Sequence, residues 1–258
     1  MNKFTICLLA VFGVAAAHAD DLPKGETVLD RFVEVTGGKA AYEKLHNEVT
    51  KGHIEFVGKG IKGTIVSYHA EPNKDYTIAE LEGVGKIESG NDGEVLWEKS
   101  AITGARVKAG EEREEAMRVG TFNPHINWRK MYVTAETVGL ENAEGVECYK
   151  VVLTPPDGAT VTQYFSKKSG FLVKSSSIHK TQMGDIPADS VTKDYKESSG
   201  VLVPFTLVNR FAGQEIQVVL DSVEFNADMK DSTFNLPDEI KALVRKNGAA
   251  NESKNKNQ

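Results

Sequence analysis

The hydrophobic pattern of the chain changes near residue 48. Before this point, Val28, Phe32 and Val35 recur at helical spacing and make one apolar stripe. After it, apolar and polar residues alternate in short runs, as they do from Thr50 to Phe56, and this alternation is typical of strands with one solvated face. The chain therefore predicts a brief helical start followed by a mainly β domain.

Two helices are expected before the change. The first would begin at a capping box, Thr27-Val28-Leu29-Asp30, and end at Gly37-Gly38, because glycine adopts the left-handed conformation that closes many helices. A shorter helix is expected from Lys39 to His46. Their apolar sides must cover an apolar surface, which the following strands would supply.

Short β-rich runs fill most of the remaining chain. In the second half, glycines stand at turns every 12 to 16 residues, a spacing that suits an antiparallel meander. These glycines are at positions 145, 158, 170, 184, 200 and 213. Near residue 221 the apolar positions switch from even to odd numbers, since Leu220 is followed by Val223 and Phe225. A bulge at Asp221-Ser222 would return both sets to one face, so the sheet is expected to be strongly curved.

The run of strands is interrupted between residues 110 and 132. The acidic run 111–115 suits the first turns of a helix and is expected to face solvent. Pro124 can occupy the first turn of another helix. Because these helices interrupt the strand order, we expect them to pack across the open face or mouth of the sheet.

Both ends of the chain are expected to lie outside the fold. Residues 1–19 have the charged start, short apolar run and Ala17-His18-Ala19 motif of a secretory signal peptide cleaved after Ala19. The apolar run is shorter than the roughly 20 residues that a membrane span needs. Residues 247–258 contain no apolar residue beyond alanine, which predicts a disordered tail. A single β domain would then occupy residues 20–246.

Composition narrows the class of protein. The chain has 258 residues, a net charge of −6, 40% hydrophobic and 26% charged residues, which is ordinary for soluble globular proteins. The acidic balance argues against a nucleic-acid partner, which would require a clustered basic face. Once Cys7 leaves with the signal, Cys148 remains alone and cannot form an intramolecular disulfide. We therefore expect an exported, soluble protein that is stabilised by its core.

The sequence carries no recognisable catalytic motif. It lacks the Gly-x-Ser-x-Gly elbow, the His-Glu-x-x-His motif, the Walker loop and paired-cysteine metal patterns. His53 and His69 lie on expected neighbouring strands, but no third metal ligand accompanies them. The expectation is therefore no enzyme, no metal and no cofactor, with a hydrolase of dispersed catalytic residues as the least favoured alternative.

A cavity is the remaining candidate site. Curved sheets of this size often enclose an apolar space, which helices would close. The candidate lining residues are apolar or aromatic residues of the expected strands, with core packing as the alternative for each of them. They are Phe56, Tyr68, Ile78, Trp97, Tyr164, Val173, Phe205, Val218 and Phe225.

Four stretches carry a resemblance to a known family. They are Thr36-Gly37-Gly38-Lys39-Ala40-Ala41-Tyr42; Gly85-Lys86-Ile87-Glu88 with Asp92-Gly93 and Trp97; Asn127-Trp128-Arg129-Lys130; and Val203-Pro204-Phe205. With the order of signal, helix, curved sheet, inserted helices and returning meander, the chain resembles the LolA/LolB-like periplasmic lipoprotein-carrier superfamily, and in particular its outer membrane lipoprotein-sorting relatives. The likeness extends over residues 25–237.

The resemblance implies an unclosed β-barrel with helices as a lid. It implies a soluble periplasmic carrier that holds acyl chains of a lipoprotein or lipid, with an envelope protein as a further partner and only transient contact with a membrane. Carriers of this superfamily use a rim arginine to hold the lid, and the sequence assigns that role to neither Arg106 nor Arg129. The alternative function is a non-catalytic envelope interaction module whose barrel is filled.

Overall fold

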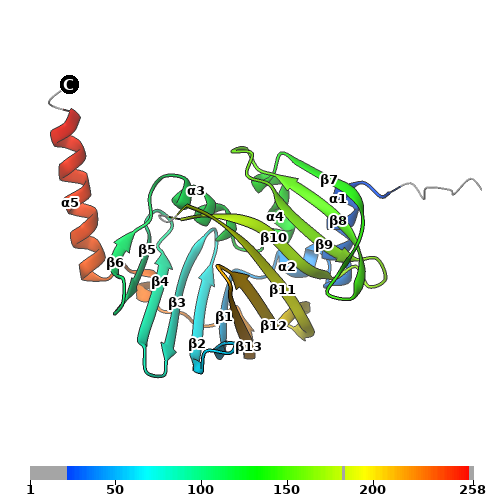
Figure 1. Ribbon diagram of the computed structural model, residues 1–258, viewed down its shortest axis with the longest axis horizontal. Helices are drawn as coiled ribbons and strands as arrows, with labels where there is room; N and C mark the ends of the chain where they lie inside the picture. Colours follow the sequence, from blue (N-terminus) through cyan, green and yellow to red (C-terminus); the bar gives the residue numbers. More distant parts are fainter. Residues whose placement is uncertain (1–21, 182–183, 256–258) are drawn as a thin grey trace, which may run out of the picture.

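One antiparallel sheet accounts for most of the structure. The computed structural model describes residues 22–181 and 184–255, and within them thirteen strands pair in the order β6-β5-β4-β3-β2-β1-β13-β12-β11-β10-β9-β8-β7 (Figure 1). The sheet is not closed, because β6 and β7 form its two edges. The strands are β1 (Asn47–Phe56), β2 (Ile61–Ala70), β3 (Lys74–Leu81), β4 (Gly85–Asn91), β5 (Leu96–Ser100), β6 (Gly104–Val107), β7 (Thr134–Ala143), β8 (Val146–Thr154), β9 (Val161–Ser166), β10 (Leu172–Thr181), β11 (Gly184–Ser198), β12 (Val201–Phe211) and β13 (Gln214–Phe225).

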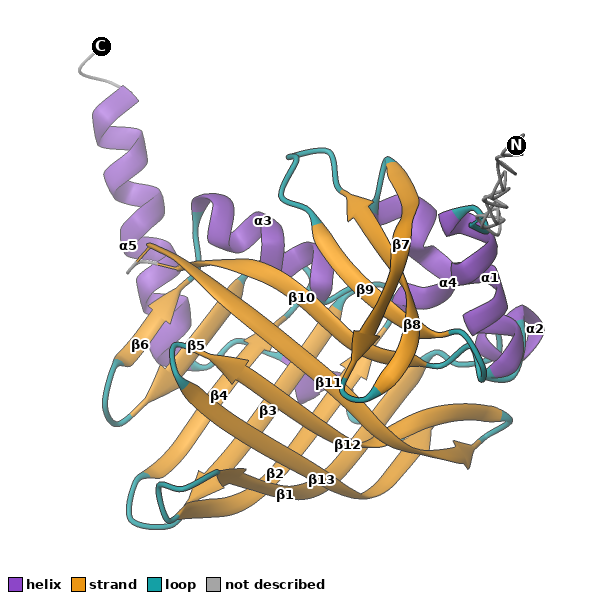
Figure 2. Ribbon diagram, turned by 45° about the vertical axis from the view of Figure 1, so that its right-hand side comes forward, coloured by secondary structure: helices purple, strands orange, loops and turns teal. Residues whose placement is uncertain are grey.

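The sheet is strongly curved, and helices cover its concave side. Figure 2 shows α1 to α4 gathered along one side of the curved sheet, with α5 apart from them. The helices are α1 (Gly25–Val35), α2 (Lys39–Tyr42), α3 (Gly110–Val119), α4 (Pro124–Met131), the 3-10 helix η1 (Asp231–Phe234) and α5 (Asp238–Asn255). The predicted fold class, an unclosed and helix-covered curved sheet, is confirmed.

One irregularity bends the sheet between β1 and β13. Lys51 pairs with Ser222. The next residue, Gly52, pairs with Leu220, which leaves Asp221 as the extra residue of a β-bulge. The bulge predicted from the apolar positions is therefore confirmed. Gly52 permits the close approach of the two strands, because a Cβ there would lie 2.3 Å from a backbone oxygen of β13.

The first helix begins earlier than its sequence signal indicates. α1 starts at Gly25, follows Lys24 as its N-cap, and has no side-chain cap, so the predicted capping box at Thr27 is wrong. Gly25 is buried, and a Cβ there would lie 2.5 Å from the backbone of Ala135 in β7. Packing against the sheet thus determines where the helix starts.

Two hydrophobic clusters join the helices to the sheet. The larger one connects α1 and α4 with β8 to β10, and consists of Val28, Leu29, Phe32, Trp128, Met131, Val151, Leu153, Phe165 and Leu172. The second connects α1 and α2 with β12 and β13, and consists of Val33, Tyr42, Leu45, Phe122, Val201 and Phe225. Cys148 is fully buried and unpaired.

The C-terminal segment packs on the convex side of the sheet near β3, β5 and β6. Glu239 of α5 forms a 2.9 Å ion pair with Lys99, and Ile240 is fully buried. α5 continues to Asn255, so residues 247–255 are helical, which differs from the disordered tail predicted for 247–258. A helix that packing has nucleated extends readily, because elongation is far more favourable than nucleation. The signal peptide predicted at 1–19 and residues 256–258 lie outside the described residues.

Candidate ligand cavity

A cavity of about 940 Å³ lies between the concave face of the sheet and the helices, and apolar atoms make up most of its surface. Ile54, Ile65, Ile216 and Val218 form its floor on β1, β2 and β13. Strand pairing explains this, since Ile54 lies opposite Val218 and opposed residues share a face. The volume falls within the roughly 300–1,000 Å³ that is usual for ligand pockets.

α1 and α4 supply a second wall. Phe32 of α1 lines the cavity together with His125, Trp128 and Met131, which are three residues apart and therefore share one face of α4. The rings of Phe32 and His125 meet edge to face with their centroids 4.6 Å apart. Burial lowers the pKa of His125 to about 4, so its imidazole is neutral at physiological pH.

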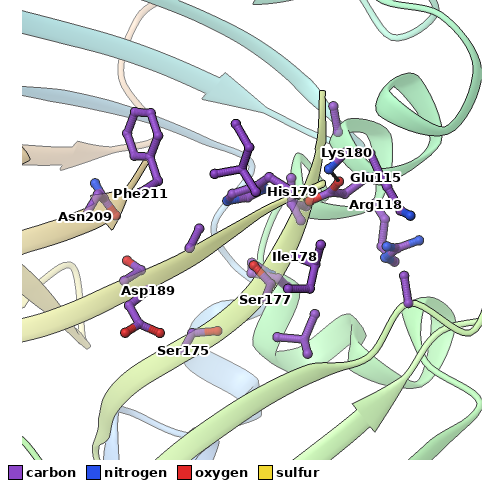
Figure 3. A pocket seen from close by; sticks show the side chains of 18 of the residues that line it. Glu115, Arg118, Ser175, Ser177, Ile178, His179, Lys180, Asp189, Asn209 and Phe211 are labelled. Atoms are coloured by element: carbon purple, nitrogen blue, oxygen red, sulfur yellow. Dashed lines mark hydrogen bonds and ion pairs between the residues drawn. The ribbon is translucent and has the colours of Figure 1, made fainter. Parts of the chain in front are cut away.

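β9 to β12 give the cavity a polar side. Ser175 and Ser177 of β10, Asp189 of β11 and Asn209 of β12 line it (Figure 3). Asp189 is paired with Lys174, whose Nζ lies 2.9 Å from the carboxylate. This side therefore offers hydrogen-bonding groups beside the apolar floor.

α3 lines the cavity without contributing a buried residue. Ion pairs hold it instead. Arg106 of β6 donates hydrogen bonds of 2.8 and 2.6 Å to the Glu112 carboxylate, and it also pairs with Glu98 of β5. The bond from Arg106 lowers the pKa of Glu112, so the pair remains ionised at neutral pH.

The opposite half of the sheet holds α3 through further contacts of Glu115 and Arg118. The Glu115 carboxylate lies 2.7 Å from Nδ1 of His179 and accepts a 2.8 Å hydrogen bond from the backbone N–H of Lys180 (Figure 3). Arg118 donates a 2.7 Å hydrogen bond to Asp157 in the β8–β9 turn. α3 is therefore attached by charged groups to both sides of the opening.

Of the nine predicted lining residues, Val218 alone is part of the cavity wall. Tyr68, Ile78 and Trp97 lie on the convex face. The strand register places their side chains on the side of the sheet opposite to that of cavity residues such as Ile65 and Glu98. There Tyr76 packs between Tyr68 and Trp97, with centroid separations of 6.2 and 6.0 Å. The convex face is thus apolar where the C-terminal segment covers it.

The other five predicted residues also lie away from the cavity wall. Tyr164 and Val173 pack with Cys148, and Phe225 belongs to the second hydrophobic cluster. Phe205 is buried beneath the Lys196 ammonium, which lies 4.4 Å from its ring centroid, and Phe56 ends β1.

The sequence prediction missed the helical side of the site. The acidic run of α3 does not simply face solvent, because Glu112 and Glu115 turn inward to Arg106 and His179. Their separation by three residues, which places them on one helix face, is the signal that could have revealed this. The wall residues of α4 follow the same spacing.

His53 and His69 do not form a site together. His53 lies on the convex face, 3.2 Å from Asp221, whereas His69 lies on the concave face between Glu48 and Asp75 in the strand register. No group of three or more metal-ligating side chains occurs in residues 22–181 and 184–255. No helix in this part of the chain is both long and apolar enough to cross a membrane.

Comparison with known proteins identifies the fold through solved structures. No protein-family model matches the sequence, and no curated protein matches it. A DUF1329 family protein from Desulfovibrio piger ATCC 29098 is 14% identical, with a TM-score of 0.55 and coverage of 83% of this chain and 98% of that one. The LolA superfamily protein NE2245 from Nitrosomonas europaea is 11% identical, with a TM-score of 0.53 and coverage of 83% and 99%.

A third solved structure gives the same result. An outer membrane lipoprotein-sorting protein domain from Vibrio parahaemolyticus is 14% identical, with a TM-score of 0.51 and coverage of 82% of this chain and 97% of that one. The chain therefore has a LolA-like fold, and the predicted resemblance is confirmed at the level of the fold.

Proposed function

We propose that this protein is a periplasmic carrier that holds acyl chains of a lipid or lipoprotein for sorting to the outer membrane. The observation that supports this most directly is the mostly apolar cavity of about 940 Å³ between the sheet and the helices. Burying hydrocarbon is favourable by about 0.8 kcal/mol per methylene, so the affinity for an acyl chain would increase with the number of methylenes that the cavity buries. The proposal includes export with cleavage after Ala19, no catalysis, an envelope protein partner and transient membrane contact.

α3 is the part of the cover that would move when cargo enters. Charged contacts at the opening hold it, and no buried side chain fixes it to the core. Replacing such contacts by water costs less than withdrawing a packed apolar side chain, so α3 can separate from the sheet while α1 and α4 stay in place.

A filled barrel that acts only as an interaction module is the alternative. It predicts close packing beneath the helices, whereas the structure has a cavity within the usual range for ligands. The cavity therefore favours the carrier.

Two adjacent valines of β13 provide a matched test. Val218 lines the cavity, whereas Val219 is 41% exposed on the other face of the strand. We expect the mature protein to take up an acylated fluorophore, Val218→Trp to lose most of that uptake by filling the cavity, and Val219→Trp to retain it. Native mass spectrometry of protein purified from its own envelope should show bound lipid as added mass. Absence of both uptake and bound lipid in the unaltered protein would refute the carrier.

A further inference from the structure

A row of uncharged polar side chains crosses the concave face of the sheet. Each member lies directly opposite the next in the strand register, so all of them share one side of the sheet. We call them the polar row: Gln163 of β9, Ser175 of β10, Ser190 of β11 and Asn209 of β12, all of which line the cavity. Val151 of β8 and Ile216 of β13 occupy the next register positions, so apolar side chains flank the polar row at both ends.

The polar row has hydrogen-bonding capacity that the protein leaves unused. Within residues 22–181 and 184–255, no hydrogen bond or ion pair joins any of its four side chains to another group. All four side chains are half-buried, and none of their polar atoms is enclosed by protein. They differ in this from Nε1 of Trp128 and Nε of Arg118, which are unpartnered but lack accessible surface. A ligand in the cavity can therefore reach the polar row.

The hydrogen-bonding chemistry of the polar row matches hydroxyl groups. An amide side chain carries donors and an acceptor, and a serine hydroxyl can act as either, so every member both donates and accepts. A ligand hydroxyl has the same double capacity, whereas an ester carbonyl only accepts. Neighbouring strands lie about 4.8 Å apart, so the four members extend over about 14 Å. This length suits a headgroup that carries several hydroxyls.

The charges around the cavity favour an uncharged headgroup. The polar row carries no charge, and the cationic side chains that line the cavity already form ion pairs with carboxylates. These cations are Arg106, Lys108, Arg118, Lys180 and Arg210. A phosphate or carboxylate on the polar row would thus lose its hydration without gaining a free counter-charge.

We propose that the polar row binds an uncharged headgroup with adjacent hydroxyls, such as glycerol or a sugar supplies, while the acyl chain lies on the apolar floor. The inference rests on the proposed carrier function and makes its cargo more specific. Ile216 of the floor lies directly opposite Asn209, so headgroup and chain meet at the boundary between β12 and β13. The site therefore selects neutral hydroxylated lipids over fatty acids and phospholipids.

The test compares 1-monolauroylglycerol with methyl laurate, because both contain the same acyl ester and only the first has free hydroxyls. Their affinities are measured by displacement of an acylated fluorophore. Gln163→Met and Asn209→Leu preserve side-chain size but remove the amide. We expect each variant to weaken monolauroylglycerol binding about 2- to 10-fold without weakening methyl laurate binding.

Gln217→Met is the matched control for these variants. Gln217 lies opposite Glu55 on the convex face and outside the cavity wall, so its replacement should leave both affinities unchanged. Dodecyl glucoside, measured in the same way, distinguishes the two sources of hydroxyls. A larger loss for the glucoside than for monolauroylglycerol in the variants would assign the polar row to a sugar, and the reverse would assign it to glycerol.

Nuclear magnetic resonance of the unaltered protein gives a second readout. The side-chain amide signals of Gln163 and Asn209, assigned through the backbone, should shift more with monolauroylglycerol than with methyl laurate. Equal shifts, or variants that bind monolauroylglycerol as the wild type does, would show that water satisfies the ligand hydroxyls and would overturn the inference while leaving the carrier intact. Failure of the wild type to bind either ligand and the fluorophore would instead refute the carrier itself.

Discussion

The helices over the concave face are held in two different ways. α1 and α4 bury large apolar side chains, among them Phe32 at 3% and Trp128 at 5% exposure, in a cluster that reaches β8 to β10. α3 buries none, and depends on the Arg106–Glu112 and Glu115–His179 contacts. α1 and α4 are thus part of the core, whereas α3 is attached by charged contacts at the opening of the cavity.

This difference matters because the two kinds of contact respond differently to disturbance. Separating packed apolar side chains costs free energy in proportion to the area exposed, with no compensation from water. Separating an ion pair near the surface is largely compensated by hydration. A protein whose cavity must open without unfolding therefore benefits from combining a packed wall with a helix that is held by charged contacts. We call the Arg106–Glu112 and Glu115–His179 contacts of α3 the latch.

Phe32→Ala should have the largest effect on stability. It removes a ring that contacts His125 and Phe165 within the main cluster, and such truncations cost about 3–5 kcal/mol. Phe211→Ala is the control, because Phe211 is 39% exposed at the cavity mouth and should lose less than about 1 kcal/mol. Urea unfolding measures both. Equal losses would contradict the assignment of α1 to the core.

A largely buried carboxyl on the concave face of β1, that of Glu48, should make stability depend on pH. Burial raises the pKa of Glu48 from 4.5 to about 7, so the folded protein retains a proton that the unfolded chain has released. Stability should therefore fall as pH rises from 4.5 to 7 and stay low above that range. Glu48→Gln removes the penalty and should raise the free energy of unfolding at pH 8 by about 1–3 kcal/mol, with little change at pH 4.

The control for this pH effect is on the same strand. Glu55→Gln changes a carboxyl on the convex face, where Lys62 lies 3.3 Å away and solvent reaches the side chain. We expect its stability to follow that of the wild type across the pH range. A parallel gain in both variants would show that burial of Glu48 is not the cause.

Glu112→Gln tests the latch directly. It leaves a hydrogen-bonding group beside Arg106 but removes the charge, and should lower stability by about 1 kcal/mol while increasing hydrogen exchange within α3. Release of a bound acylated fluorophore should accelerate in the same variant. Glu111→Gln is the matched control, because the Glu111 side chain is 78% exposed and the change removes a 3.6 Å ion pair with Lys180 at the surface. Similar release rates in the two variants would argue against a latch at Glu112.

The sequence predicts the architecture better than the site, for a physical reason. Strand alternation and turn glycines determine pairing locally, and the parity switch at Asp221 even locates the bulge. Alternation does not say which face is concave. Trp97 looks like a lining residue because it is apolar, yet η1 and α5, far along the chain, cover the face on which it lies.

The latch is hidden from the sequence for a similar reason. Glu112 and Arg106 are near in sequence, but Glu115 meets His179 across 64 positions, and the curvature of the open sheet brings them together. Buried and exposed residues also do not alternate clearly over much of β11. The sequence therefore indicates only weakly which residues of these strands form the polar side of the cavity. Site geometry depends on these long-range contacts.

Arg129→Gln should have the smallest effect and completes the comparison between packed and charged contacts. Arg129 joins α4 to α1 through Asp30, with an Nη2–Oδ2 distance of 3.1 Å, but both side chains are more than half exposed. Exposed pairs of this kind contribute about 0.2–1 kcal/mol, and the packed wall beneath them stays in place without the pair. Fluorophore release should therefore remain at the wild-type rate, unlike that of Glu112→Gln. If Arg129→Gln instead accelerated release as much as the α3 variant, α4 rather than α3 would be the moving cover.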